Sequence, residues 1–171
     1  MNLKTRQLTI TGILGAVAIV LSVTPLGYIP VPTPAGSATI MHIPVIIGAI
    51  VEGPIVGGFI GLIFGITSFL RGGAPFFADP LIAVGPRILI GILAAYSYKL
   101  GKGRISGAAL AAVVGTLTNT IGVLTLTVVR GYLNYKVAAG IAIGHGIPEV
   151  IVAVLVTVAI IKVLARTELN I

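Results

Sequence analysis

Long apolar runs recur along the 171-residue chain, and short segments rich in proline, glycine or charge separate them. A helix that crosses the hydrocarbon core of a membrane needs about 20 mostly apolar residues. The runs therefore predict an all-α integral membrane protein, in which six transmembrane helices form a bundle. The predicted spans cover residues 7–24, 37–51, 55–70, 81–98, 105–129 and 137–161.

The segments between the runs are typical of turns and loops. Residues 25–36 contain Pro25, Pro30, Pro32 and Pro34, a density that a helix interior does not tolerate. The second predicted span, which follows this loop, is short for a complete crossing. In the third span, the regularly spaced Gly57, Gly61 and Gly65 indicate close packing against a neighbouring helix.

The composition supports a single domain over residues 1–171, with no soluble part. Of the residues, 57% are hydrophobic and 9% are charged, whereas a soluble domain carries about 25% charged residues. The absence of cysteine excludes disulfides, thiol catalysis and cysteine-based metal sites. The net charge of +7 is assigned to basic cytoplasmic loops rather than to nucleic-acid binding.

The basic residues predict the orientation of the bundle. Cytoplasmic loops of membrane proteins carry an excess of lysine and arginine. With six spans and a cytoplasmic N-terminus, the outer loops hold only Arg71, Arg130 and Lys136. Both termini are therefore predicted to be cytoplasmic. The basic residues on the predicted inner side are Lys4, Arg6, Lys99, Lys102, Arg104, Lys162 and Arg166.

Two charged residues, Arg87 and Glu149, lie inside predicted spans. Such a charge costs at least ~2.5 kcal/mol on insertion scales, and it usually faces a partner, a cavity or a ligand. In one reading the two residues form an ion pair that fixes helix packing. In the other, the fork of Arg87 binds an anionic ligand group, while Glu149 accepts hydrogen bonds from hydroxyl or amide donors.

Other polar residues extend this set of candidates. Asn119, near the middle of the fifth span, either bridges helices or contacts a ligand. His145 precedes Glu149 by one helical turn and shares its face. His42 is either an interfacial residue or a ligand contact, and the outer loops contribute Tyr132 and Asp79. The candidate substrate-binding residues are Arg87, Asn119, Glu149, His145, His42, Tyr132 and Asp79.

Catalytic and metal-binding motifs are absent from the sequence. There is no G-x-x-x-x-G-K-[ST] phosphate loop, no H-E-x-x-H motif and no cluster of acids. A small membrane enzyme using Glu149 and His145 is an alternative, but nothing places a nucleophile beside them. A stand-alone secondary transporter is a further alternative, although the sequence shows no inverted repeat. We therefore expect that the protein is not an enzyme and that it binds no cofactor and no metal.

Three stretches carry a recognisable pattern: TIMHIPVIIGAIVEGP at 39–54, VGGFIGLIFG at 56–65 and DPLIAVGPRILIG at 79–91. They resemble the substrate-binding (S) components of energy-coupling factor (ECF) vitamin transporters. The resemblance implies a six-helix bundle in a prokaryotic cell membrane that captures a vitamin from outside. It also implies docking on a transmembrane coupling protein that carries two ATPase subunits, which fits the missing phosphate loop.

The family pattern also assigns roles to residues near the N-terminus. In the family, a small-xxx-small pair on the first helix, usually two alanines, meets the coupling protein. Here Gly12 and Ala16 match that pair, with Gly15 beside them. The loop after this helix often gates the site, a place taken here by residues 25–36. Metal-carrying members have a histidine after the initiating methionine, where this chain has Asn2, so nickel and cobalt are not expected.

The pantothenate-type subgroup is the most similar. Flat vitamins are normally stacked on aromatic side chains, yet this chain has no tryptophan and only 6% aromatic residues. A small aliphatic acid needs a cation instead, and Arg87 supplies one. Riboflavin, pyridoxine, hydroxymethylpyrimidine and folate remain alternative substrates.

Overall fold

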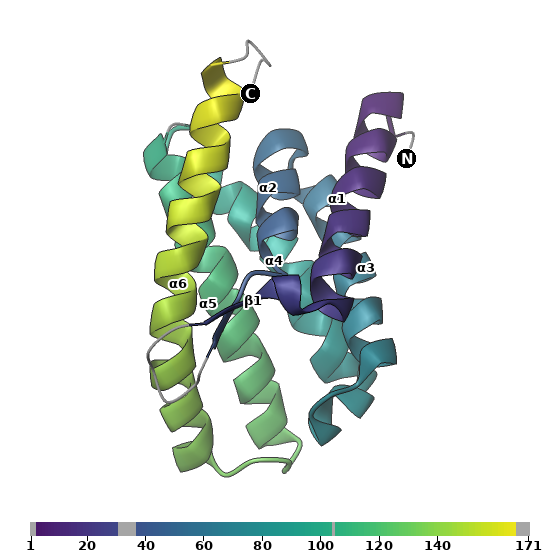
Figure 1. The fold of residues 1–171 in the computed structure, drawn as a ribbon, viewed down its shortest axis with the longest axis vertical. Helices are drawn as coiled ribbons and strands as arrows, with labels where there is room; N and C mark the ends of the chain where they lie inside the picture. The colour runs from purple at the N-terminus through teal and green to yellow at the C-terminus, as the bar shows by residue number, and fades with distance from the viewer. Residues whose placement is uncertain (1–2, 31–36, 104, 167–171) are drawn as a thin grey trace.

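The structure is a computed structural model that describes residues 3–30, 37–103 and 105–166. Its described part is a bundle of α-helices, as predicted, with two short strands and two 3-10 turns (Figure 1). The helices are α1 (Thr5–Val23), α2 (Ile43–Glu52), α3 (Pro54–Arg71), α4 (Pro80–Leu100), α5 (Ile105–Val129) and α6 (Tyr135–Arg166). The other elements are η1 (Pro25–Gly27), β1 (Tyr28–Pro30), β2 (Ser37–Thr39) and η2 (Pro75–Ala78).

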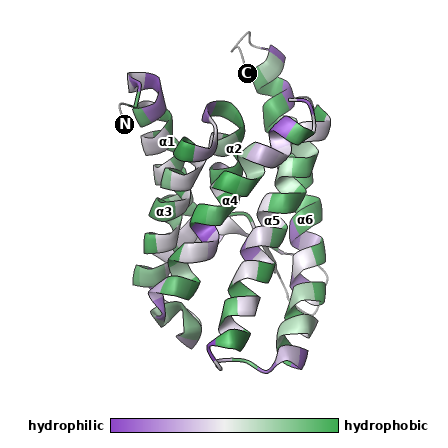
Figure 2. Ribbon diagram, turned by 180° about the vertical axis from the view of Figure 1, so that it is seen from behind, coloured by the Kyte–Doolittle hydropathy of each residue, from purple (hydrophilic) through white to green (hydrophobic). Residues whose placement is uncertain are grey.

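Five of these helices, all except α2, are long and apolar enough to cross a membrane. Apolar residues cover most of their length, and hydrophilic residues gather towards helix ends and loops (Figure 2). Both termini lie at the same end of the bundle (Figure 1). The sequence therefore predicted the helical membrane class correctly.

The second predicted span differs from the structure. Its first residues, Ser37–Thr39, form strand β2, which pairs antiparallel with β1 so that Tyr28 lies opposite Thr39. Only Ile43–Glu52 is helical. Ten residues at 1.5 Å each span about 15 Å, half of the ~30 Å hydrocarbon core. The strands cross the bundle near its mid-height (Figure 1), and residues 31–36 of the predicted loop lie outside the described residues.

Helix α2 forms the centre of the bundle. It contacts each of the other α-helices, and every residue from Ile43 to Ile50 is buried. A helix that is apolar on all faces is suited to such a buried position. Because α2 starts at mid-depth, the space beyond its N-terminus is free for a cavity between the remaining helices.

Glycines bring α3 and α4 into backbone contact, which confirms the predicted packing role of Gly57, Gly61 and Gly65. A Cβ atom at Gly61 would lie 2.1 Å from the carbonyl oxygen of Arg87. A Cβ at Gly65 would lie 2.8 Å from the Cα of Val84. The contact fixes the part of α4 that carries Arg87 directly against α3.

We predict that Gly61→Ala destabilises the protein by about 1–3 kcal/mol, because the added methyl group forces α3 and α4 apart. Gly58→Ala on the same helix is the control, since its Cβ would meet its nearest neighbours at 4.0 Å. Thermal unfolding in detergent should show a lowered midpoint for Gly61→Ala alone. Equal midpoints for the two variants would contradict the close contact.

Candidate functional site

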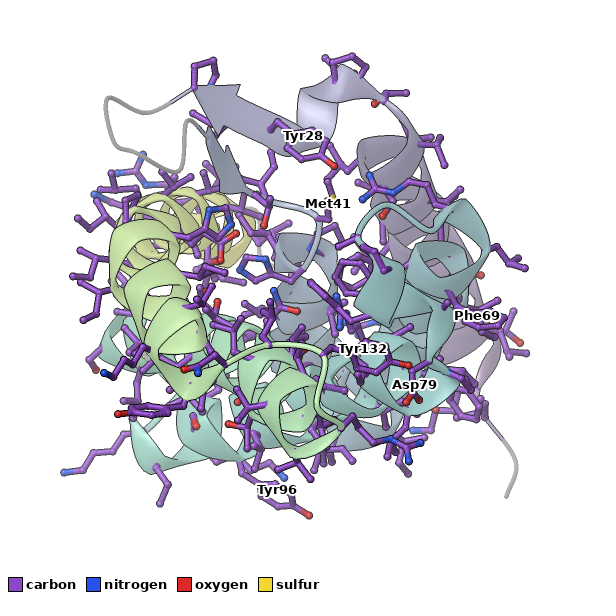
Figure 3. All side chains as sticks on the ribbon, turned by 90° about the horizontal axis from the view of Figure 1, so that it is seen from below. Tyr28, Met41, Phe69, Asp79, Tyr96 and Tyr132 are labelled. Atoms are coloured by element: carbon purple, nitrogen blue, oxygen red, sulfur yellow. The ribbon has the colours of Figure 1, made fainter. Side chains whose placement is uncertain are left out.

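A cavity of about 270 Å³ lies between β1–β2, η2 and helices α3 to α6. We call it the central cavity. Figure 3 views the bundle from the end opposite the termini, with Tyr28 and Met41 on the side of the strands. Four of the predicted site residues line the central cavity together: Arg87, Asn119, His145 and Glu149. The residues come from three different helices, so the fold gathers the polar groups of separate spans.

The carboxylate of Glu149 is held by several protein groups. Its side chain is 1% exposed. Oε1 accepts hydrogen bonds from the Thr39 backbone N–H at 3.0 Å, from the Thr39 hydroxyl, and from Nε2 of His145 at 2.9 Å. Oε2 accepts one from the Thr120 hydroxyl at 3.0 Å. Glu149 thus joins β2, α5 and α6, and both of its carboxylate oxygens accept hydrogen bonds from the protein.

Arg87 is buried but only partly satisfied. It is 4% exposed, and its Nη1 donates to the Ile82 carbonyl oxygen at 2.8 Å. The guanidinium carbon lies 5.5 Å from the ring centre of Phe64 and 5.0 Å from that of Phe77. Nε is buried and has no hydrogen-bond partner among the described residues.

The direct Arg87–Glu149 ion pair, one of the two readings of the sequence, is not formed in the described part of the structure. Glu149 is paired with His145 instead. The two opposite charges nevertheless line the same cavity. A buried donor without a partner is costly, and in the described residues the Nε atom of Arg87 is such a donor.

Two further polar groups line the central cavity. The Oδ1 atom of Asn119 is buried and unpartnered in the described residues. Arg71, at the end of α3, donates from Nη1 to the Tyr28 hydroxyl at 2.7 Å and to the Ser22 carbonyl oxygen. The sequence predicts Arg71 in an outer loop and not in the site, because nothing local indicates that its side chain turns inward.

Strand β2 also contributes a site residue that the sequence did not reveal. Thr39 lines the cavity and reaches Glu149, which is 110 positions away in the chain. Thr120, the neighbour of Asn119, is a second such residue. No spacing in the sequence signals these contacts, although the run of threonines around Asn119 is an indication of polar packing inside a span.

His42 lies outside the cavity lining and is not interfacial. It is 0% exposed, and its Nε2 lies 2.9 Å from the Thr116 hydroxyl of α5. The interfacial reading fails because α2 starts in the middle of the bundle rather than at its surface. The observed role of His42 is to join the N-terminus of α2 to α5.

Asp79 and Tyr132 also lie outside the lining of the central cavity. Asp79 accepts a hydrogen bond from the Leu81 N–H at the start of α4 and pairs with Arg130 at 2.8 Å. Burial by itself raises the pKa of the Asp79 carboxyl, but these hydrogen bonds and the Arg130 charge offset it and leave the pKa below its ordinary value. Tyr132 is 47% exposed.

The three small residues expected at a docking face on α1 do not share one surface. Gly12 and Ala16 are exposed. Gly15 is buried, and a Cβ atom there would lie 2.8 Å from Cδ1 of Ile63 on α3. Gly15 therefore allows close packing of α1 against α3 within the bundle. The surface open to a partner is the one with Gly12 and Ala16.

The described structure is thus a membrane-type helical bundle with a cavity whose mainly apolar lining includes a few charged and polar side chains. The sequence model of the family described as "ECF transporter, substrate-specific component" matches residues 6–163. The chain belongs to this family, which confirms the resemblance found in the sequence. The family is a transporter component rather than an enzyme family, and with several helices able to span a membrane it places the protein in the membrane.

Two bacterial proteins are similar to this chain in sequence. The "Pantothenic acid transporter PanT" of Lactococcus lactis subsp. cremoris is 36% identical over 158 aligned positions, which cover 77% of this chain and 80% of the relative. The "Pantothenate transporter PanT" of Leuconostoc mesenteroides subsp. mesenteroides is 30% identical over 197 aligned positions, covering 95% and 94%.

We predict that Thr116→Val destabilises the protein by about 1–3 kcal/mol, because it leaves the buried His42 ring without its hydrogen-bond partner. Thr118→Val is the matched control on the same helix, since among the described residues the Thr118 hydroxyl bonds only to the Val114 carbonyl oxygen of its own helix. Chemical or thermal unfolding in detergent measures both. If Thr118→Val costs as much as Thr116→Val, the His42–Thr116 contact does not join α2 to α5 as described.

Proposed function

We propose that this protein is the high-affinity membrane subunit that binds pantothenate for uptake by an ECF transporter. The observation that carries the proposal is the buried, incompletely satisfied guanidinium of Arg87 in the central cavity. A cation in this setting favours an anionic ligand. The two relatives, both named as pantothenate transporters, indicate which acid this is.

The chemistry of pantothenate matches the distribution of groups in the cavity. Pantothenate has a carboxylate at one end, an amide in the middle, and two hydroxyls beside two methyl groups at the other end. The carboxylate would bind Arg87, with Arg71 as a second cation in the lining. The amide N–H would donate to the free Oδ1 of Asn119.

The hydroxyl end would then lie towards Glu149 and His145. The carboxylate of Glu149 already accepts four hydrogen bonds from the protein, and it would add a contact to a ligand hydroxyl. Apolar side chains of the lining, including Met41, Val123 and Leu124, would contact the two methyl groups. His42, Asp79 and Tyr132 support the bundle around this site in the proposal rather than touching the ligand.

The topology that we propose has six crossings and cytoplasmic termini. The two termini lie at one end of the bundle (Figure 1), which requires an even number of crossings. Since five helices are long enough to cross, the segment from β2 through α2 would supply the sixth. The excess of basic residues in the loops at the end that carries the termini supports a cytoplasmic position for that end.

The proposed partners follow from the family. Residues 1–171 would form one domain that docks on a transmembrane coupling protein bearing two ATPase subunits. The exposed Gly12 and Ala16 offer a flat part of α1 for this contact, because small side chains let helices approach closely.

The purified chain should bind pantothenate with 1:1 stoichiometry and without ATP, as measured by calorimetry in detergent. Arg87→Ala should lower the affinity about 100-fold or more, because it removes one partner of a buried charge pair. Arg130→Ala is the control, since this arginine pairs with Asp79 outside the cavity lining. A wild-type chain that does not bind pantothenate, or an Arg87→Ala variant with wild-type affinity, would contradict the proposal.

The absence of cysteine makes single-cysteine labelling a clean test of the topology. We expect Tyr132→Cys to react with a membrane-impermeant maleimide added to intact cells, because Tyr132 is exposed in the loop opposite the termini. Lys102→Cys should react only after the membrane is opened. Labelling of both variants from outside would exclude the orientation proposed here.

A further inference from the structure

The surroundings of Arg87 contain more aromatic than hydrogen-bonding contacts. One hydrogen bond, to the Ile82 carbonyl oxygen, ties the guanidinium to its own helix. The rings of Phe64 and Phe77 lie within 5.5 Å of its central carbon. A cation at this distance from a ring face is attracted by the π electrons, and more strongly where water is excluded. The two rings therefore contribute to fixing the guanidinium in place.

The two rings differ in their positions. Phe64 is 3% exposed and belongs to the packed core of α3. Phe77 is half-buried in η2, the turn between α3 and α4, and it lines the central cavity. Its neighbour Phe76 also lines the cavity, with the two ring centres 4.8 Å apart. Phe76 thus has the same side chain as Phe77 and lies in the same turn. In the described structure, however, its ring does not contact Arg87.

A fixed orientation matters because the cavity already contains an anion. Glu149 lines the same space. A guanidinium that could reorient would pair with that carboxylate instead of with a ligand. In the structure Arg87 donates to the Ile82 carbonyl oxygen and contacts the two rings instead, and its Nε has no partner in the part of the chain that the structure describes. A ligand carboxylate thus meets an arginine that has not been neutralised by its own protein.

We propose that Phe77 is a positioning residue that makes the cavity selective for a carboxylate by holding Arg87 away from Glu149. This inference rests on the proposed function, because it assigns the ligand carboxylate to Arg87. Phe77 acts here through its ring, whose centre lies 5.0 Å from the guanidinium carbon of Arg87.

The test compares pantothenate with panthenol, in which a CH₂OH group replaces the carboxylate. Calorimetry or competition binding in detergent gives the ratio of the two affinities for each variant. Phe77→Leu should lower this ratio about fivefold or more, because the ring contact with the cation is lost. Phe77→Tyr keeps the ring and should restore the wild-type ratio. Phe76→Leu, the matched control, should weaken both ligands by the same factor and leave the ratio unchanged.

The outcomes separate this inference from the proposed function. If the wild-type chain prefers pantothenate and Phe77→Leu keeps the wild-type ratio, the positioning role is overturned and the proposed function stands. A ratio lowered equally by Phe76→Leu and Phe77→Leu would also overturn it, since general packing of the turn would then explain the loss. A wild-type chain that binds neither ligand would overturn both proposals.

Discussion

A permanently charged guanidinium, sheltered inside a membrane-type bundle with part of its hydrogen-bonding capacity unused, is the constraint on which the site depends. The protein compensates its two buried charges differently. Glu149 receives donors from β2, α5 and α6, whereas Arg87 receives one carbonyl oxygen and two aromatic rings. This asymmetry favours an anionic ligand over a cationic one. It also makes the part of the cavity at Arg87 chemically different from the part at Glu149.

The fold produces this asymmetry through backbone geometry. Glycines on α3 allow α4 to approach so closely that Arg87 faces the Phe64 side of the bundle. The short α2 ends the central packing at mid-depth, and β1–β2 closes the space beyond it with Tyr28 and Thr39. Residues that carry no charge thus decide which charged groups can meet in the cavity.

The sequence predicted the features that depend on local pattern. Apolar runs located the long helices, because the cost of exposing polar backbone to lipid leaves few alternatives. The rarity of polar residues in those runs singled out Arg87, Asn119, His145 and Glu149, all of which line the cavity. The contacts made across the bundle were not predictable in this way. His42 is buried because α2 begins inside the bundle, and Thr39 reaches Glu149 from the strand just before it. Arg71 turns inward to contact Ser22 and Tyr28, which are far away in the sequence. Hydrophobicity alone does not determine these contacts.

A structure of the protein with pantothenate bound, determined by crystallography or electron cryomicroscopy, tests the central claim most directly. We predict that the ligand carboxylate lies within hydrogen-bonding distance of Arg87, with the Thr39–Glu149 and His145–Glu149 contacts still present. A ligand bound elsewhere, or an Arg87 paired with Glu149 while the ligand carboxylate points away, would contradict it.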